Sequence, residues 1–195
     1  MNPKMIVIAG PPGSGKSTAF PVSTFGVAFF NADDRAAELN GGSYIGISNT
    51  IRQQVNRDVE SFVHNQIAKG ESFAIETTLR SQTTFEQARL AKTAGFQIEV
   101  RFLALADLAT HVERVKARAD AGGHGASEST LRRIHSSSLN NLPRAAAEAD
   151  HLWVYDNSLV GGPPRFVLEA NSGRIVYVDD PPPQWLVNAF GWAVD

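Results

Sequence analysis

The segment Gly10-Pro-Pro-Gly-Ser-Gly-Lys-Ser17 constrains the fold more than any other part of this chain of 195 residues. It matches the pattern G-x-x-x-x-G-K-[ST] in full, and it lies between an apolar run, Met5–Ala9, and a segment of helical character that begins at Lys16. In this context the glycines let backbone N–H groups surround phosphate oxygens, and the helix N-terminus adds the positive end of its dipole. The sequence therefore predicts a phosphate-binding P-loop in an α/β domain.

The residue types within the loop indicate how it would bind ATP and Mg²⁺. Lys16 is expected to reach the β- and γ-phosphates, and the Ser17 hydroxyl is expected to ligate Mg²⁺. The other loop residues expected to contact the nucleotide are Gly10, Pro11, Pro12, Gly13, Ser14, Gly15 and Thr18. The guanine-recognition pattern Asn-Lys-x-Asp does not occur in the sequence, which disfavours a GTPase and favours a compact phosphotransferase.

Short apolar runs alternate with helical patterns along the chain, which is typical of a parallel sheet covered by helices on both faces. The expected strands are Met5–Ala9, Val27–Asn31, Ser72–Glu76, Ile98–Ala104 and His151–Tyr155. The expected helices begin at Lys16 and cover Ser48–Lys69, Gln82–Ala94, Leu108–Ala119, Ser127–Asn141 and Leu142–Ala149.

Past Gly161 the pattern changes to that of a β-hairpin over Phe166–Val178, followed by a short helix near Trp185. We therefore expect a single domain over residues 1–195 with an α/β, three-layer P-loop kinase fold. Its core, about residues 5–160, would contain a five-stranded parallel sheet. An antiparallel hairpin and the short helix would occupy about residues 161–195.

The overall composition argues against several classes of protein. The formal net charge is -2, hydrophobic residues make up 43% and there is no cysteine, so a basic nucleic-acid-binding surface, disulfides and thiolate metal sites are disfavoured. No apolar run reaches the length of a membrane span, and Met5–Ala9 is better explained as a buried strand than as a signal peptide. The histidines lack metal-ligand spacing, so no zinc site is expected. We expect a cytoplasmic protein without membrane or nucleic-acid partners.

Two adjacent aspartates, Asp33 and Asp34, follow the second expected strand, at the edge where open parallel sheets bind ligands. Either one could orient or deprotonate an acceptor hydroxyl. Either one could instead cap the helix that begins near Arg35, because aspartate is favoured at helix N-caps. We favour Asp33 as the catalytic base and Asp34 as the cap.

The third expected strand ends in a second polar segment, Glu76-Thr-Thr-Leu-Arg80. Glu76 could hold Mg²⁺ through water or bind the acceptor, and Thr77, Thr78 and Arg80 could hydrogen-bond the acceptor. The alternative is a simple turn into the next helix, with Thr77 or Thr78 as its cap. The residues alone leave the two interpretations about even.

Four arginines lie on either side of a glycine-rich stretch, residues 121–126. Arg114 and Arg118 share one face of a predicted helix, and Arg132 and Arg133 follow beyond the glycines. Arginines that fold over the phosphates from a lid would neutralise charge in the transition state. The alternative for each is a solvated helix surface.

Two other polar residues lie near the predicted site. His124, within the glycine-rich stretch, could touch phosphate or stabilise the lid. Asn157, after the fifth strand, lies where such sheets often meet the nucleotide base, although a plain Asx turn over Asp156-Asn-Ser158 is a serious alternative.

Seven motifs, in this order, resemble the zeta toxin family over about residues 5–160. They are Gly10–Thr18, Asn31–Asp33, Phe73–Leu79, Arg114–Arg118, Gly122–His124, Ser138–Leu142 and Tyr155–Ser158. The resemblance implies a P-loop kinase with ATP and Mg²⁺, and several members phosphorylate the 3′-hydroxyl of a UDP-activated N-acetyl amino sugar. It also implies toxicity to bacteria that lack a partner antitoxin protein.

By this resemblance, Lys16 and Ser17 handle phosphate and metal, and Asp33 matches the catalytic aspartate of the family. Glu76 and Thr78 match its acceptor-binding strand end. The lid arginines would be Arg118 and either Arg132 or Arg133.

Three alternatives to a toxin kinase stay open. The first is a housekeeping metabolite or nucleotide kinase, and the second is a non-catalytic switch that uses ATP to change partners. The third, a polynucleotide end kinase, is disfavoured because the chain lacks a basic stripe with interleaved aromatic residues.

Overall fold

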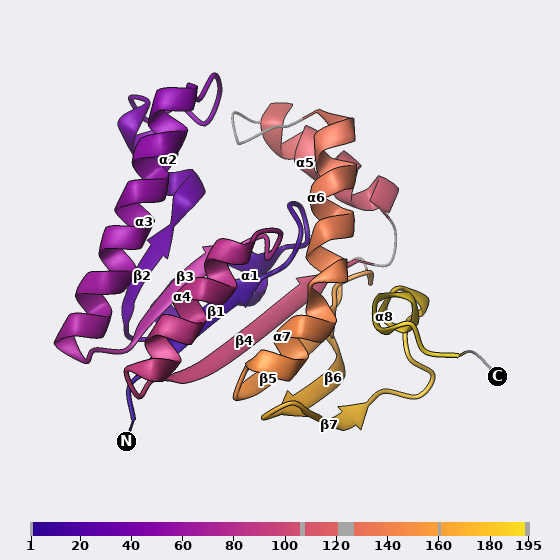
Figure 1. The fold of residues 1–195 in the computed structure, drawn as a ribbon. Helices are drawn as coiled ribbons and strands as arrows, with labels where there is room; N and C mark the ends of the chain where they lie inside the picture. Colours follow the sequence, from indigo (N-terminus) through magenta and orange to yellow (C-terminus); the bar gives the residue numbers. More distant parts are fainter. Residues whose placement is uncertain (1, 106–107, 121–126, 160, 194–195) are drawn as a thin grey trace.

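Seven strands form one sheet in the order β2-β3-β1-β4-β5-β6-β7 (Figure 1). The structure, a computed structural model, describes residues 2–105, 108–120, 127–159 and 161–193. The strands are β1 (Lys4–Ala9), β2 (Ala28–Asn31), β3 (Phe73–Thr77), β4 (Gln97–Ala104), β5 (His151–Asp156), β6 (Arg165–Asn171) and β7 (Arg174–Val178).

The predicted parallel core and C-terminal hairpin are both confirmed. Strands β1 to β5 pair in parallel, whereas β6 pairs antiparallel with β5 and with β7. The hairpin thus continues the sheet beyond β5, which makes the sheet mixed and seven-stranded.

The helices fall close to their expected positions. They are α1 (Lys16–Ala19), α2 (Ala32–Leu39), α3 (Asn49–Lys69), α4 (Gln82–Thr93), α5 (Leu108–Asp120), α6 (Glu128–Asn140), α7 (Leu142–Glu148) and α8 (Gln184–Phe190), with a 3-10 turn η1 at Val22–Thr24. Among the described residues, no helix is both long and apolar enough to cross a membrane.

Most of the hydrophobic core lies on one face of the sheet, under α3, α4, α7 and α8. Phe73 of β3 is fully buried at its centre, with ring centroids 5.8 Å from both Phe62 of α3 and Phe96 before β4. On this side Trp185 of α8 is also buried, and its indole N–H donates to Asp156 Oδ2 at 3.2 Å. The terminal helix therefore belongs to the same core as the P-loop strands.

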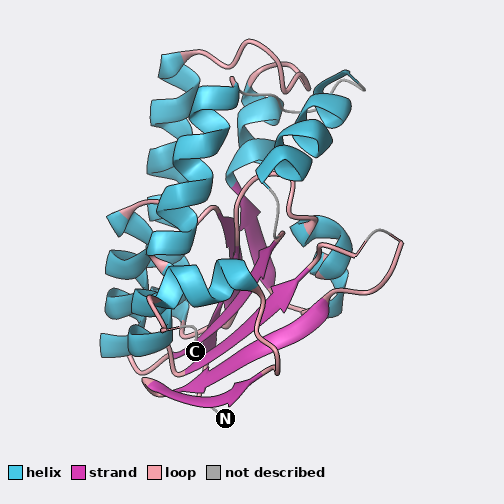
Figure 2. Ribbon diagram, turned by 90° about the vertical axis from the view of Figure 1, so that its right-hand side faces the viewer, coloured by secondary structure: helices cyan, strands magenta, loops and turns pink. Residues whose placement is uncertain are grey.

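The opposite face is covered less fully than the apolar runs predicted. Ile6, Ile8 and Ala74 are buried there beneath the segment that contains α1 and η1. Beyond this segment the face carries half-buried aromatic residues, such as Trp153 and Tyr155 of β5. Figure 2 shows how much more helix lies on one side of the sheet than on the other.

Two helical arms stand at the carboxyl ends of the parallel strands (Figure 1). In one arm, α2 is tied to α3 because Arg35 Nε donates to Asp58 Oδ2 at 2.7 Å. In the other, Val112 and Val115 of α5 form a small buried cluster with Leu131 of α6. The P-loop lies at the strand ends between these arms.

Replacement of Phe73 by alanine should lower the free energy of unfolding by about 3–5 kcal/mol, because it removes a fully buried ring that contacts two others. Urea unfolding followed by far-UV circular dichroism measures the loss. Val176→Ala on β7 is the control, since Val176 is 57% exposed and its loss should cost less than about 0.5 kcal/mol. Equal losses in the two variants would contradict this description of the core.

Candidate functional site

The P-loop connects β1 to α1 and is packed tightly between α5 and the end of β5. Gly13 has φ +80° and Gly15 has φ +93°, both in the left-handed region that favours glycine. A Cβ atom at Gly13 would lie 2.8 Å from the carbonyl oxygen of His111, and one at Gly15 would lie 2.6 Å from Asn157 Nδ2. Gly13 is therefore required by space as well as by conformation, whereas a side chain at Gly15 would displace the amide of Asn157.

The side chains inside the loop have the character expected of a phosphate cradle. The side chain of Lys16 is 7% exposed, and its ammonium group donates to the carbonyl oxygens of Gly10 at 2.9 Å and Pro11 at 3.3 Å. Ser14 is fully buried, and its Oγ has no hydrogen-bond partner within the described part of the chain. A buried cation beside a buried unsatisfied hydroxyl fits an anionic ligand such as a triphosphate.

Glu76 joins the loop to the neighbouring strands. Its carboxylate lies 3.6 Å from Lys16 Nζ, accepts a hydrogen bond from Ser17 Oγ at 3.4 Å and accepts another from Asn31 Nδ2 at 3.5 Å. The parallel register explains this, because Glu76 pairs with Ile8 of β1 on one side and with Asn31 of β2 on the other. A hydroxyl and a carboxylate side by side are oxygen ligands of the kind that Mg²⁺ prefers.

The interpretation of Asp34 as the helix cap is wrong. The N-cap of α2 is Asn31, whose Oδ1 accepts from the backbone N–H of Asp33 at 2.9 Å and of Asp34 at 3.4 Å. Because the helix begins at Ala32, both aspartates lie within its first turn. Asp34 accepts instead from the hydroxyl of Tyr44 at 2.9 Å, while Asp33 is exposed and has no side-chain partner among the described residues.

The threonines at the end of β3 do not cap α4 either. The N-cap of α4 is Ser81, and Thr77 Oγ1 accepts from the N–H of Leu79 at 3.2 Å while lying 3.2 Å from Thr84 Oγ1. Thr78 is half-buried and Arg80 is exposed. Their predicted contacts with an acceptor stay predictions.

The four predicted arginines lie in the arm formed by α5 and α6. Arg114 is half-buried, and its Cβ lies 3.6 Å from the position that a Cβ at Gly13 would take. Arg132 is paired with Glu128 at 2.8 Å, and Arg133 is exposed without an ion-pair partner among the described residues. The side chain of Arg118 and all of residues 121–126, with His124, lie outside the described residues. Of the three arginines whose side chains the structure describes, only Arg114 lies next to the loop.

Asn157 supports the P-loop through its side chain. Its Nδ2 donates to the carbonyl oxygen of Ser14 at 2.8 Å, while its backbone N–H donates to Ala104 at 2.8 Å. The Asx turn is also present, because Asp156 Oδ1 accepts from the N–H of Ser158 at 2.8 Å. A contact between Asn157 and the nucleotide base stays a prediction.

His111 is the residue of this site that the sequence analysis missed. It is 2% exposed; its Nε2 accepts from the N–H of Leu105 at 3.2 Å, and its Nδ1 donates to the carbonyl oxygen of Pro12 at 3.0 Å. Burial, opposed in part by the bond to Pro12 and reinforced by nearby His135, lowers the pKa of His111 from 6.5 to about 4. The only sequence signal was its position four residues before Val115 on one apolar helix face.

A family model described as AAA domain matches residues 5–138, which is about two thirds of the chain. The chain belongs to this family. The AAA domain match runs from β1 into α6, so it contains the P-loop, Glu76 and α5, whereas β5, the hairpin and α8 lie beyond it. A protein of Haemophilus influenzae without a characterised function is 25% identical over 133 residues, 68% of this chain and 92% of that protein.

Among solved structures, this chain is similar to a chain of the AvrRxo1-ORF1:AvrRxo1-ORF2 complex with sulphate ions, with a TM-score of 0.69. The two chains are 15% identical, and the match covers 92% of this chain and 62% of that chain. It therefore spans less than two thirds of that longer chain. It is also similar to a chain from the PezAT toxin–antitoxin system of Streptococcus pneumoniae, with TM-score 0.62 and 17% identity over 80% of this chain and 68% of that one. At these identities the likeness shows the fold, which is that of P-loop kinases.

Stability should fall in mildly acidic solution because of His111. The folded pKa of about 4 lies below the unfolded value near 6.5, so the unfolded chain takes up the proton first as the pH falls. Stability from the neutral ring is fully present above pH 6.5 and is lost toward pH 4, by up to about 3 kcal/mol. Urea unfolding at several pH values should show a flatter profile in His111→Gln than in wild type. Exposed His64→Gln is the control, and a profile unchanged in His111→Gln would contradict the assignment.

Proposed function

We propose that this protein transfers the γ-phosphoryl group of ATP to a hydroxyl group of a small molecule. The observation that supports this best is the position of Glu76, which contacts Lys16, Ser17 and Asn31 at once. Since Asn31 caps the helix that carries Asp33, the phosphate loop and an exposed acid lie at the same edge of the sheet. A phosphotransferase needs this combination, because the phosphate and the acceptor must meet.

Each residue would act through chemistry that its surroundings permit. Lys16, released from the Gly10 and Pro11 carbonyls, would bind the phosphates, and Asp33 would accept the proton of the acceptor hydroxyl as its oxygen attacks phosphorus. The bond between the terminal phosphorus and the bridging oxygen breaks, and ADP leaves. Asp33 suits the role of base because it is exposed and has no side-chain partner within the described part of the chain, whereas Glu76 is already engaged by Lys16.

Ser17, with Glu76 nearby, would hold Mg²⁺, which when bound neutralises charge on the phosphates. Thr77, Thr78 and Arg80 extend the same edge and would contact the acceptor. Arg114 lies beside the loop and would contact the phosphates directly. Arg118, with Arg132 or Arg133, would approach from the same arm; Arg132 would first have to leave Glu128.

The resemblance to zeta toxins supports a finer proposal, in which the acceptor is a UDP-activated N-acetyl amino sugar and an antitoxin protein is the partner. We further propose that the chain is one cytoplasmic domain. The PezAT system, to which the fold is similar, is named as a toxin–antitoxin system, and one structure similar to this chain was solved with ATP.

Asp33→Asn should lower turnover by about 10²–10⁴-fold, because the asparagine amide cannot accept the proton of the acceptor hydroxyl. The affinity for ATP should stay nearly unchanged, because in this proposal the side chain at position 33 does not contact the phosphates. The measurement is ADP release with the acceptor present, together with nucleotide titration by calorimetry. Asp34→Asn is the matched control, since an amide oxygen can still accept from Tyr44, and it should retain activity. Turnover near the wild-type level in Asp33→Asn would remove Asp33 from the mechanism.

The acceptor can be identified with wild type and Lys16→Ala side by side. Each protein is incubated with ATP and one candidate acceptor, which is UDP-N-acetylglucosamine, a simple sugar or a nucleoside, and the products are identified by mass spectrometry. In a separate experiment, each protein is expressed in bacteria and growth is followed. We expect wild type to produce a phosphorylated UDP-sugar and to arrest bacterial growth, and we expect Lys16→Ala to do neither. A different phosphorylated product without arrest would indicate a housekeeping kinase, and no product from any acceptor would favour the ATP-dependent switch.

A further inference from the structure

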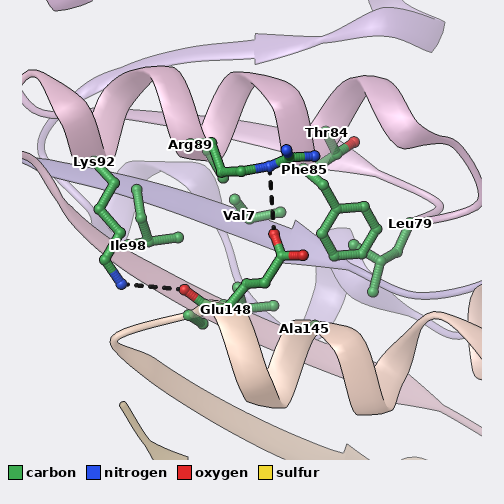
Figure 3. A pocket seen from close by; sticks show the side chains of 12 residues that line it. Val7, Leu79, Thr84, Phe85, Arg89, Lys92, Ile98, Ala145 and Glu148 are labelled. Carbon is green, nitrogen blue, oxygen red and sulfur yellow. Dashed lines mark hydrogen bonds and ion pairs between the residues drawn. The ribbon is translucent and has the colours of Figure 1, made fainter. Parts of the chain in front are cut away.

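The core face of the sheet is closed where α4 and α7 pack together. The cavity between these helices has a volume of about 30 Å³, which is about the share of one water molecule. At its rim, Arg89 Nε lies 3.7 Å from Glu148 Oε2, and Lys92 Nζ donates to the carbonyl oxygen of Glu148 at 3.2 Å (Figure 3). The space between α4 and α7 is therefore too small for a ligand, and the charged groups at its rim are already paired.

The free edge of the sheet is different in character. β7 is the last strand in the order, so its outer side has no neighbouring strand within the described part of the chain (Figure 1). All five of its residues are exposed, and four of them are apolar or aromatic: Ile175 at 41%, Val176 at 57%, Tyr177 at 40% and Val178 at 36%. An edge strand with unpaired backbone groups and apolar side chains is a ready template for pairing with another strand.

The side chain of Tyr177 fixes the shape of this edge. Its ring stacks on that of Phe166 in β6, with centroids 5.0 Å apart and planes inclined by 4°. Its hydroxyl donates to Asp179 Oδ1 at 3.2 Å, and the other carboxylate oxygen of Asp179 lies 3.0 Å from Arg165 Nε. A strand that is already held in this way loses little conformational freedom when another strand pairs with it, which favours association.

The opposite edge of the sheet is less suited to pairing. β2 has only four residues, and none of the large exposed hydrophobic side chains of the described chain lies on it. A contact between β7 of one copy and β2 of another would also leave an edge free on each copy, so it would continue into filaments. A contact between two β7 strands uses the same edge of both copies and is closed.

The charges at the two ends of β7 favour an antiparallel partner. Arg174 begins the strand, and Asp180 lies two residues beyond its end. Both are exposed, and neither side chain has a hydrogen-bond or ion-pair partner among the described residues. Two antiparallel copies of β7 centred on Tyr177 would place Arg174 of each copy opposite Asp180 of the other. Two parallel copies would place the arginines side by side, and like charges in directly opposite positions are destabilising.

We propose that two copies of this chain associate through β7, as a symmetric antiparallel pair of edge strands that joins their two sheets into one. Backbone groups of the two free edges would pair across the two-fold axis, and Val176 of each copy would lie opposite Val178 of the other. The contact stops at a dimer because it uses up the same edge of both copies. It goes beyond the proposed phosphotransfer and does not depend on it.

Sedimentation velocity of the full chain, over a range of concentrations up to about 0.5 mM, tests the proposal. A contact through five-residue strands is smaller than a standard interface, so we expect a dissociation constant on the order of 10–100 µM. The average mass should rise with concentration toward that of two chains and no further. Val176→Lys places a charge within the contact and should remove this rise, whereas Ile45→Lys, at a similarly exposed position outside β7, should associate as wild type does.

Arg174→Glu and Asp180→Lys test the orientation of the two strands. In either variant alone, like charges would face each other at both ends of the contact, so association should weaken about three- to tenfold. In an equimolar mixture of the two variants, opposite charges would face each other at both ends. A heterodimer should then form with about the wild-type affinity, which also shows that both variants are folded.

Three results would overturn the proposal: a mass that does not rise with concentration, association of Val176→Lys equal to that of wild type, or a mixture of the charge variants that associates no better than each variant alone. Growth of the mass beyond two chains would overturn it as well, because it would indicate an open contact between different edges.

Discussion

The hydrogen bonds and the ion pair that hold the P-loop from several sides are the constraint on which the rest of the site depends. Asn157 donates to Ser14 from the end of β5, His111 donates to Pro12 from α5, and Glu76 lies beside Lys16 from β3. Each contact comes from a different element. They can be made together only because β1 lies between β3 and β4, with β5 next in line. The order of the strands in the sheet therefore fixes the position of the P-loop.

One of these contacts also sets the relation between the loop and the α5–α6 arm. His111 and Arg114 lie on neighbouring turns of α5, and Gly13 is packed against the same stretch of helix. A movement of α5 therefore moves the loop or breaks the bond to Pro12. Since the ring must accept from Leu105 and donate to Pro12 at once, only the neutral tautomer protonated at Nδ1 satisfies both groups. Burial lowers the pKa of His111 and so keeps the ring neutral near neutral pH, and the two hydrogen bonds then select the tautomer.

Most of the fold could be predicted from local pattern, whereas the details of the site could not. The P-loop, the five parallel strands and the hairpin follow from motif and periodicity, which are properties of neighbouring residues. The cap of α2 was misassigned because Asn31, Asp33 and Asp34 are all good capping residues, and the choice depends on where the strand ends. His111 was missed because its partners, Leu105 and Pro12, are backbone groups that leave no trace in residue type.

The packing of α4 beside α7 was unpredictable for a related reason. Alanines such as Ala88 and Ala145 are ordinary helix formers, and nothing in their local sequence indicates that the two helices are neighbours. Likewise, the charged residues of α4 resemble any solvated helix surface until the fold brings Lys92 beside Asp150. These contacts depend on long-range pairing and not on residue type.

The two acids of the candidate site illustrate how environment separates roles between similar groups. Glu76 is 16% exposed at its side chain and is engaged by a buried ammonium group, a hydroxyl and an amide. These three contacts fix the Glu76 side chain between the phosphate loop and β2. Asp33 lies in the first turn of α2, exposed to solvent and unpaired among the described residues. The contacts of Glu76 tie it to the phosphate loop, whereas the exposed Asp33 is the acid to which our proposal gives the acceptor proton.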